Sequence, residues 1–406
     1  MKKLIVISFF CMFALSLFPQ EKRHEVTVLN VSVSVRVLDG NQFVNDLSKD
    51  DFELYEDGKL QNIEALYLIN KKNIVRQETL RGYYPSLARH YYLLFQITDY
   101  NPKLNDAIEH FIHNVIQPGD TLTIWTPQKR YNLTSDSLQT IPKEQISKEM
   151  QKIIRKDTQI SASYYRELMR DLKRLVRAMS STQASGRTGS ISEMEADYTT
   201  HGTPGYLLTS YRETLQKIEE LGTFNEANLI KFAGVLKRKE GENIVFYFCQ
   251  REYRPEISSS TLAKMQSQFQ DDPNIMGLLQ ELFQFYHKTA AFNEENIKNV
   301  FADSSILFNL IFMNKTPEFV SGMYMREQSE DVFEAFSKAA EATGGSVDTS
   351  QDPAIGFKNA LDISDSYYLI YYSPRDYKSD GKFRQISVKI KNKNYRILHR
   401  AGYFAN

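Results

Sequence analysis

The sequence predicts an α/β protein, with a central, mostly parallel sheet covered by helices on both faces and a small β-sandwich-like region built from N-terminal and C-terminal strands. Continuous apolar runs alternate with segments of helical periodicity between residues 88 and 362, as in parallel sheets. Alternating valines precede this part, and strand-like segments separated by turn signals follow it. The 406 residues, 42% of them apolar, are sufficient for two or three units with real cores.

The composition excludes two classes of protein. The chain has 50 Lys and Arg residues against 50 Asp and Glu, so it lacks the overall basicity of a nucleic-acid binder, and we expect no nucleic-acid partner. Its two cysteines, Cys11 and Cys249, are too few for a small disulfide scaffold.

Residues 1–20 have the pattern of a secretory signal peptide. Lys2 and Lys3 precede an apolar run, Leu4 to Phe18, that is too short for a comfortable membrane span. We therefore expect an exported protein, periplasmic, extracellular or cell-surface, with no transmembrane segment in the mature chain; an uncleaved anchor is the alternative. Cleavage would remove Cys11, and Cys249 would remain at the end of a buried strand.

Residues 24–75 predict an N-terminal β region. Valines alternate with other residues from Val26 to Val37, and further strands are expected within 50–57 and 63–68. The region is too short to close a core alone. We therefore expect it to pack with C-terminal strands in residues 365–406, at 367–372, 383–390 and 395–403.

Residues 88–362 predict the parallel sheet and its helices. Buried strands are expected at 91–95, 121–125, 244–249 and 306–312, and the last helix ends at Thr343-Gly344-Gly345. Residues of about 140–205 predict a helical insertion. Its part from 143 to 178 holds ten Lys and Arg against five Asp and Glu, and 180–205 reads as a Ser, Thr and Gly-rich loop. We interpret the basic helix as packed on the domain with its charged face in solvent. Contact of that face with a partner or a membrane surface is the alternative.

Several segments occur in a characteristic order: the N-terminal valines, Asp51-Phe52-Glu53-Leu54-Tyr55-Glu56-Asp57-Gly58, Leu93-Leu94-Phe95, Pro118-Gly119-Asp120, Thr343-Gly344-Gly345, Tyr367-Tyr368-Leu369-Ile370-Tyr371-Tyr372, Gly381-Lys382-Phe383-Arg384 and Gly402-Tyr403-Phe404. This ordered set resembles the bacterial von Willebrand factor type A-related proteins over nearly the whole mature chain. The resemblance implies a Rossmann-like type A domain in a secreted protein that binds other proteins. It also implies a ligand site after the first core strand, where the family often carries Asp-x-Ser-x-Ser around a divalent cation.

The expected metal motif is degenerate in this sequence. Directly after Phe95 it would read Gln96, Thr98 and Tyr100, and the neutral amide of Gln96 is a much weaker partner for Mg²⁺ than a carboxylate. A register starting at Asp99 gives Asn101 and Lys103, which brings a positive charge into the cation site. Gln250 and Arg251 follow the next strand where an acidic ligand is expected, and Thr223 is the candidate loop threonine.

Other catalytic or metal patterns are incomplete. His110 and His113 lie three residues apart on a predicted helix, but the sequence offers no clear third zinc ligand. No Gly-x-Ser-x-Gly elbow occurs.

We therefore expect a secreted, non-enzymatic protein interaction module without a cofactor. An unknown protein partner, from the envelope or the extracellular space, would contact the degenerate loop Gln96, Thr98, Asp99, Tyr100 and Asn101, with Tyr100 as an aromatic anchor. The alternative is adhesion or ligand binding that depends on Mg²⁺ or another divalent metal.

Overall fold

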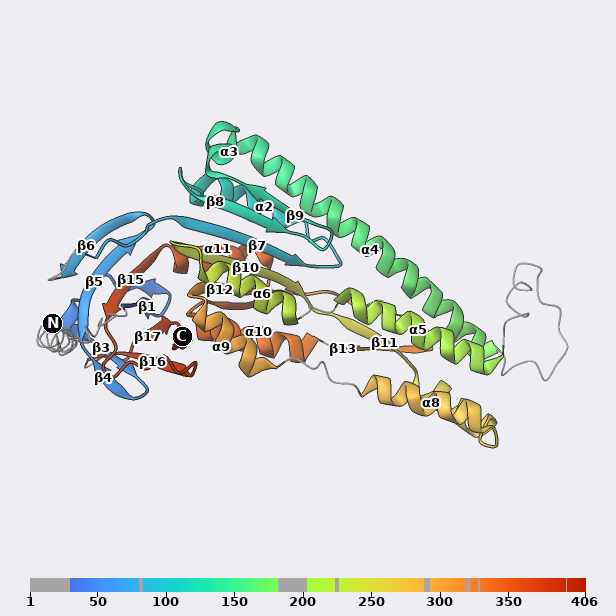
Figure 1. The fold of residues 1–406 in the computed structure, drawn as a ribbon. Coiled ribbons are helices and arrows are strands. Elements are labelled where there is room, and N and C mark those ends of the chain that lie inside the picture. The colour runs from blue at the N-terminus through green and yellow to red at the C-terminus, as the bar shows by residue number, and fades with distance from the viewer. Residues whose placement is uncertain are drawn as a thin grey trace, which may run out of the picture.

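The computed structural model describes residues 30–79, 83–181, 203–222, 226–287, 293–317, 319, 322–327, 329–391 and 393–406. The protein is α/β, with one mostly parallel sheet and several antiparallel sheets (Figure 1). The strands are β1 (Val31–Asp39), β2 (Gln42–Phe43), β3 (Phe52–Glu56), β4 (Lys59–Gln61), β5 (Ile63–Asn70), β6 (Asn73–Thr79), β7 (Arg89–Gln96), β8 (Thr121–Trp125), β9 (Arg130–Leu133), β10 (Glu242–Gln250), β11 (Tyr253–Ile257), β12 (Ile306–Met313), β13 (Met323–Glu327), β14 (Val347–Gln351), β15 (Ser366–Tyr372), β16 (Phe383–Ile390), β17 (Arg396–His399) and β18 (Gly402–Phe404). The helices are η1 (Lys49–Asp51), α2 (Leu104–His110), η2 (Phe111–Val115), α3 (Ser135–Thr140), α4 (Lys143–Ser181), α5 (Pro204–Gly222), α6 (Glu226–Lys237), α7 (Ser259–Gln268), α8 (Pro273–Tyr286), α9 (Glu294–Asp303), α10 (Ser329–Thr343) and α11 (Pro353–Ser364). The signal segment 1–20 and most of the loop predicted at 180–205 lie outside the described residues.

The central sheet has the spatial order β14-β12-β10-β7-β8-β9. Its neighbouring strands are parallel except for β8 and β9, which pair antiparallel. Counted in chain order from β7, the six strands run 3-2-1-4-5-6 from β9 to β14. The order therefore reverses between β7 and β10, so loops leave their carboxyl ends in opposite directions.

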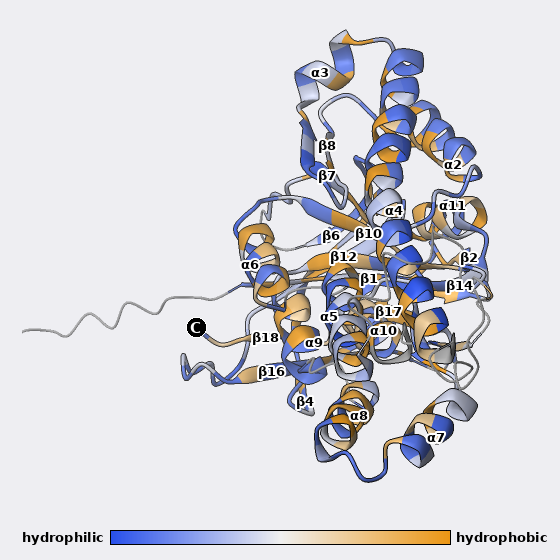
Figure 2. Cartoon of the chain, turned by 90° about the vertical axis from the view of Figure 1, so that its right-hand side faces the viewer, coloured by the Kyte–Doolittle hydropathy of each residue, from blue (hydrophilic) through white to orange (hydrophobic). Residues whose placement is uncertain are grey.

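Helices cover both faces of this sheet. On one face, Phe111 of η2 and Phe357 of α11 pack on strand residues such as Tyr91 and Phe246. On the other face, α6, α9 and α10 cover residues such as Tyr247. Strands buried on both faces are mostly apolar, in agreement with the orange colour of the middle of the sheet around β12 (Figure 2).

The two ends of the chain build the antiparallel part together. β15 lies between β1 and β5 in the sheet β17-β1-β15-β5-β6, while β16 pairs with β3 in the sheet β18-β16-β3-β4. Side chains from both sheets share one apolar core. The segment expected as a single strand at 395–403 is two strands, β17 and β18, because Arg400 and Ala401 leave the ladder between them.

A second helical core extends away from the sheet. The distal part of α4 packs with α5, α7, α8 and the β11–β13 ribbon. In Figure 1, α5 and α8 lie at the end of the molecule opposite the sheets formed by the two chain ends. The helical part therefore draws on residues up to 286 and beyond, in addition to the predicted insertion at 140–205. Within the described part of the chain, none of the helices combines the length and the apolar character required to cross a bilayer.

Candidate functional site

The candidate site lies where the strand order of the central sheet reverses. β7 ends at Gln96 and its parallel neighbour β10 ends at Gln250, with Gln96 aligned to Cys249. Polar residues that follow neighbouring parallel strands meet at one edge of the sheet, and ligands of open α/β sheets bind outside this edge. The predicted loop from Gln96 to Asn101 is at this position.

Gln250 fixes the backbone of the loop. Its side-chain Oε1 accepts hydrogen bonds from the backbone N–H groups of Thr98 and Asp99, both at 2.9 Å, and its Nε2 donates to the carbonyl oxygen of Asp99 at 2.6 Å. The side chain of Gln250 is 5% exposed. Gln250 therefore holds the loop in one conformation through three bonds, and these bonds occupy its amide.

A lysine ammonium lies against the oxygen atoms of the site. Lys315, which follows β12, donates from Nζ to Thr98 Oγ1 at 2.6 Å and forms an ion pair with Glu252 Oε2 at 3.0 Å. Thr98 Oγ1 donates in turn to Glu252 Oε1 at 3.1 Å. The ammonium also lies 4.4 Å from the ring centroid of Tyr165, so a cation of the chain itself contacts a hydroxyl, a carboxylate and an aromatic face.

The other predicted site residues point to different partners. The Gln96 amide donates to the carbonyl oxygen of Leu221 at 3.4 Å, and Asn101 Oδ1 accepts from the backbone N–H of Lys103. Asp99 is exposed. Lys103, which the shifted register placed in the cation site, instead pairs with Asp352 Oδ2 at 2.5 Å, and this bond holds the pKa of the Asp352 carboxyl below its ordinary value.

Tyr100 differs from the exposed anchor expected from the sequence. It is half-buried, packs against the core of the central sheet, and its hydroxyl donates to Asn105 Oδ1. Burial raises the pKa of the Tyr100 hydroxyl. Tyr100 therefore secures the base of the loop and contributes little free surface.

Sequence reasoning missed Glu252 and Lys315. Gln250 and Arg251 were placed where an acidic ligand is expected, but the acidic residue lies one position further on, at Glu252. Glu252 and Lys315 each follow a strongly apolar strand of the parallel sheet by two residues. This shared position at the carboxyl edge was the signal that could have grouped them. Thr223 lies outside the described residues.

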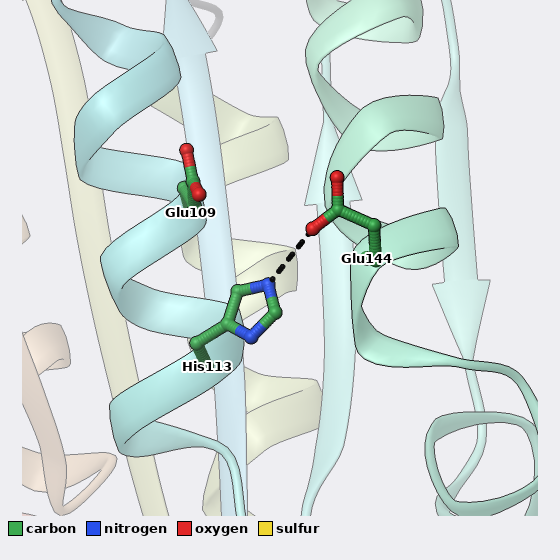
Figure 3. A group of neighbouring side chains, drawn as sticks. All are labelled: Glu109, His113 and Glu144. Atoms are coloured by element: carbon green, nitrogen blue, oxygen red, sulfur yellow. Dashed lines mark ion pairs between the residues drawn. The ribbon is translucent and has the colours of Figure 1, made fainter.

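A second group of possible ligands lies on the helices beside the sheet. Glu109, His113 and Glu144 bring one ligand atom each within 4.8 Å of one another (Figure 3). The sequence offered no third partner for the histidines, because Glu144 comes from α4. His113 pairs with Glu144 at 3.5 Å, and Lys148 also pairs with Glu144 at 2.9 Å. All three side chains are exposed, and Lys148 neutralises the charge of Glu144. We therefore do not assign a metal ion to this group.

Cys249 is not poised for catalysis. It is 5% exposed at the end of β10, and burial raises the pKa of its thiol far above the ordinary value. A thiol that stays protonated is a poor nucleophile.

No protein-family model, curated protein or solved structure matched this chain.

Proposed function

We propose that this chain is an exported, non-enzymatic protein interaction module built on a Rossmann-like type A domain with a degenerate metal site. Two features of the sheet support the type A assignment: the strand order 3-2-1-4-5-6 and the single antiparallel strand β9 at its edge. The N-terminal signal pattern supports export.

The contact between Lys315, Thr98 and Glu252 carries the proposal. A divalent cation at the switch point would need the Thr98 hydroxyl and the Glu252 carboxylate as oxygen ligands. The Lys315 ammonium already binds both, and its positive charge would repel a second cation at this distance. The lysine thus supplies permanently the charge that a metal supplies in a metal-dependent site.

The loops at this edge form the proposed contact surface. Asp99, Pro102 and Asn314 are exposed there, on loops that follow β7 and β12. Because Gln250 and Tyr100 fix the first loop, a partner would meet a surface that is already ordered, which lowers the entropic cost of binding. The exposed Asp99 carboxylate favours a partner with a basic or hydrogen-bond-donating group.

Metal titration separates this proposal from the metal-dependent alternative, which the Thr98 and Glu252 oxygens favour. Calorimetry of the wild-type protein with Mg²⁺, Mn²⁺ and Ca²⁺ should show no site that fills below about 1 mM, the weak end of extracellular sites. Lys315→Ala should gain measurable binding, whereas the matched control Lys103→Ala should not. Micromolar binding by the wild-type protein that disappears in Asp99→Ala would establish the metal-dependent function instead.

A partner experiment tests the surface itself. The immobilised protein is exposed to an envelope extract of its native source with EDTA or with Mg²⁺. A specific partner should be retained equally under both conditions, should be lost with Asp99→Arg, and should be kept by the control Asp136→Arg on α3. Retention that needs Mg²⁺, or that ignores Asp99→Arg, would contradict the proposal.

A further inference from the structure

A cavity of about 160 Å³ lies at the opposite, amino-terminal edge of the central sheet. Its walls come from β1 and β15 of the antiparallel part and from the starts of β10 and β12. The polar lining residues that matter here are Ser32, Ser34, Arg36, Glu242, Ser305 and Arg400. The cavity therefore lies at the junction between the two parts of the molecule.

The sequence of β1 explains why the cavity is polar. Val31, Val33, Val35 and Val37 fill the core of the antiparallel sheets. The intervening side chains point to the other face of the strand, because successive residues of a strand alternate. The serines and the arginine of the Val-Ser-Val-Ser-Val-Arg-Val pattern consequently face the parallel sheet and line the cavity.

Two guanidinium groups face this space. Arg36 is 1% exposed and pairs with Glu242 Oε1 at 2.5 Å. Arg400 donates to Ser305 Oγ at 2.5 Å and to the carbonyl oxygen of Ser32 at 2.7 Å. The Nε of Arg400 is buried and has no hydrogen-bond partner among the described residues. Because the Nε is buried, the donors that Arg400 offers to the cavity are the second N–H of each Nη group, beyond those bonded to Ser305 and Ser32.

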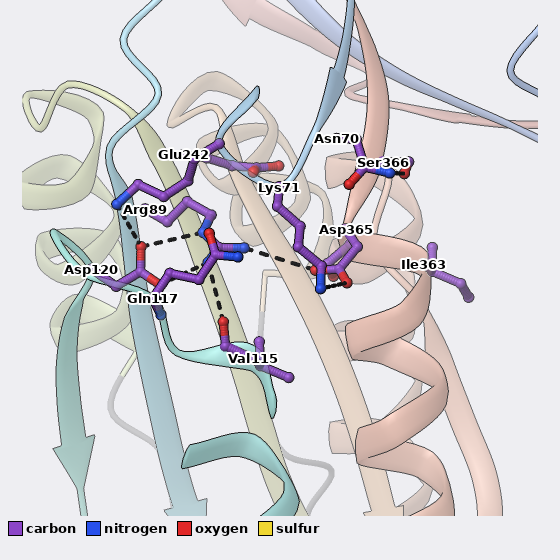
Figure 4. Close-up of polar contacts among 12 residues, drawn as sticks. Asn70, Lys71, Arg89, Val115, Gln117, Asp120, Glu242, Ile363, Asp365 and Ser366 are labelled. Carbon is purple, nitrogen blue, oxygen red and sulfur yellow. Dashed lines mark hydrogen bonds and ion pairs between the residues drawn. The ribbon is translucent and has the colours of Figure 1, made fainter. Parts of the chain in front are cut away.

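The charges around the cavity do not cancel. Arg36, Arg400 and one carboxylate, that of Glu242, line the cavity, and Glu242 pairs with Arg36. In the adjoining network Lys71 and Arg89 lie beside Asp120 and Asp365 (Figure 4), and Lys72 and Asp362 bring its cations and carboxylates into balance. The cavity lining therefore keeps one more positive than negative charge. Such an excess in a partly enclosed space attracts anions.

We propose that this cavity binds a small oxyanion, a carboxylate or phosphate-type group, held by Arg400 with serine hydroxyls around it. The cavity, with a volume of about 160 Å³, has room for such an anion. Ser34 and Ser86 offer further hydroxyl donors. The anion would contact residues of both parts and would thereby stabilise their junction. This inference is independent of the function proposed for the opposite edge.

Thermal unfolding of the full chain tests the proposal. Inorganic phosphate, sulfate and acetate are titrated separately at constant ionic strength, with chloride as the balancing anion. At least one of them should raise the melting temperature with a saturable dependence on concentration, as expected for a ligand of the folded state. A response to phosphate and sulfate alone would indicate a phosphoryl-type ligand, and a response to acetate would indicate a carboxylate. A featureless response equal to that of chloride would overturn the proposal.

Variants locate the site. Ser34→Leu places a larger, apolar side chain in the cavity, and it should weaken anion binding at least tenfold. Ser387→Leu makes the same change on β16, away from the cavity lining, and should keep the anion response. Ser86→Leu, in the segment that leads into β7, repeats the test if Ser34→Leu does not fold. An unchanged anion response in the folded cavity variants would refute the assignment.

Discussion

Arg89 and Asp120 form a buried ion pair whose removal should strongly destabilise the protein. Arg89 Nη2 lies 2.8 Å from Asp120 Oδ2, and Nε donates to Oδ1 at 3.3 Å, with side chains 3% and 0% exposed. Arg89 also donates to the carbonyl oxygen of Val115 at 3.2 Å, and Asp120 accepts from the backbone N–H of Gln117 at 2.8 Å (Figure 4). The pair therefore joins the first strand of the central sheet to the turn before β8.

The expected loss follows from the charge that each substitution leaves behind. Asp120→Ala leaves the Arg89 guanidinium buried, with Asp365 3.8 Å away as its remaining carboxylate. An uncompensated buried charge costs about 3–5 kcal/mol of the free energy of unfolding. Arg89→Met should cost less, because Lys72 Nζ still lies 3.1 Å from Asp120 Oδ1. Arg89→Met with Asp120→Leu removes both charges and should lose less than the two single changes added together.

Urea unfolding followed by circular dichroism measures these free energies. Glu295→Ala, which breaks an exposed pair with Lys298, is the matched control and should change stability by less than about 1 kcal/mol. The reasoning would be refuted if Asp120→Ala were no more destabilising than this control. Additive losses in the double variant would show that the two charges do not interact.

Three further measurements test other parts of the fold. Gly345→Ala should lower the free energy of unfolding by more than about 2 kcal/mol, because the added Cβ would lie 1.8 Å from a backbone oxygen of β12. Gly277→Ala, in open space on α8, should raise the free energy of unfolding by about 0.5–1 kcal/mol. Urea unfolding of both variants measures these changes, and the opposite ranking would contradict the prediction. Burial lowers the pKa of His399, whose Nε2 accepts a hydrogen bond from the backbone N–H of Val388, so the folded state binds fewer protons than the unfolded state. The free energy of unfolding should therefore fall as the pH drops below about 6.5. His399→Gln should flatten that fall between about pH 7.5 and 5.5, and equal slopes of the free energy of unfolding against pH in the two proteins would argue against this cause. Gln250→Ala should speed hydrogen exchange at the two loop amides that its side chain holds, and unchanged exchange there would show that the loop is fixed by other contacts.

The parts of the fold that the sequence predicted are those with a local signal. The alternation from Val31 to Val37 and the apolar runs of β10 and β12 reflect burial on one face or on both, and each becomes a strand at the expected place. Short strands such as β11 and β13 were missed, because they pair with each other across about seventy residues and carry no strong periodicity. The break in the ladder at Arg400 and Ala401 also lies beyond local reasoning, because the backbone N–H of Ala401 bonds to the carbonyl oxygen of Ala342 on α10, which is distant in the sequence.

Charged residues were predicted less well, for a physical reason. A charge in the sequence has no partner until the fold supplies one: Asp120 follows Pro118 and Gly119, and its partner Arg89 is 31 residues away. Lys103 and Lys315 show the same limit at the candidate site. The register that starts at Asp99 would bring Lys103 into the cation position, but the Lys103 ammonium pairs with Asp352. Lys315, more than two hundred residues from the loop, takes the place beside Thr98 because β12 and β7 end at the same edge of the sheet.

The two edges of the central sheet differ in how far their positive charges are matched by carboxylates of the chain. At the carboxyl edge, Lys315 is matched by Glu252, with Thr98 as a further acceptor, so the cation has partners within the chain. At the amino edge, Arg36 and Arg400 line the cavity with a single carboxylate, that of Glu242. Satisfied charges fix a structure, whereas an unbalanced charge beside a cavity favours a ligand of opposite sign. The amino edge is therefore where this fold is expected to take up a small anion, and the carboxyl edge is where it is expected to present a fixed surface to a protein.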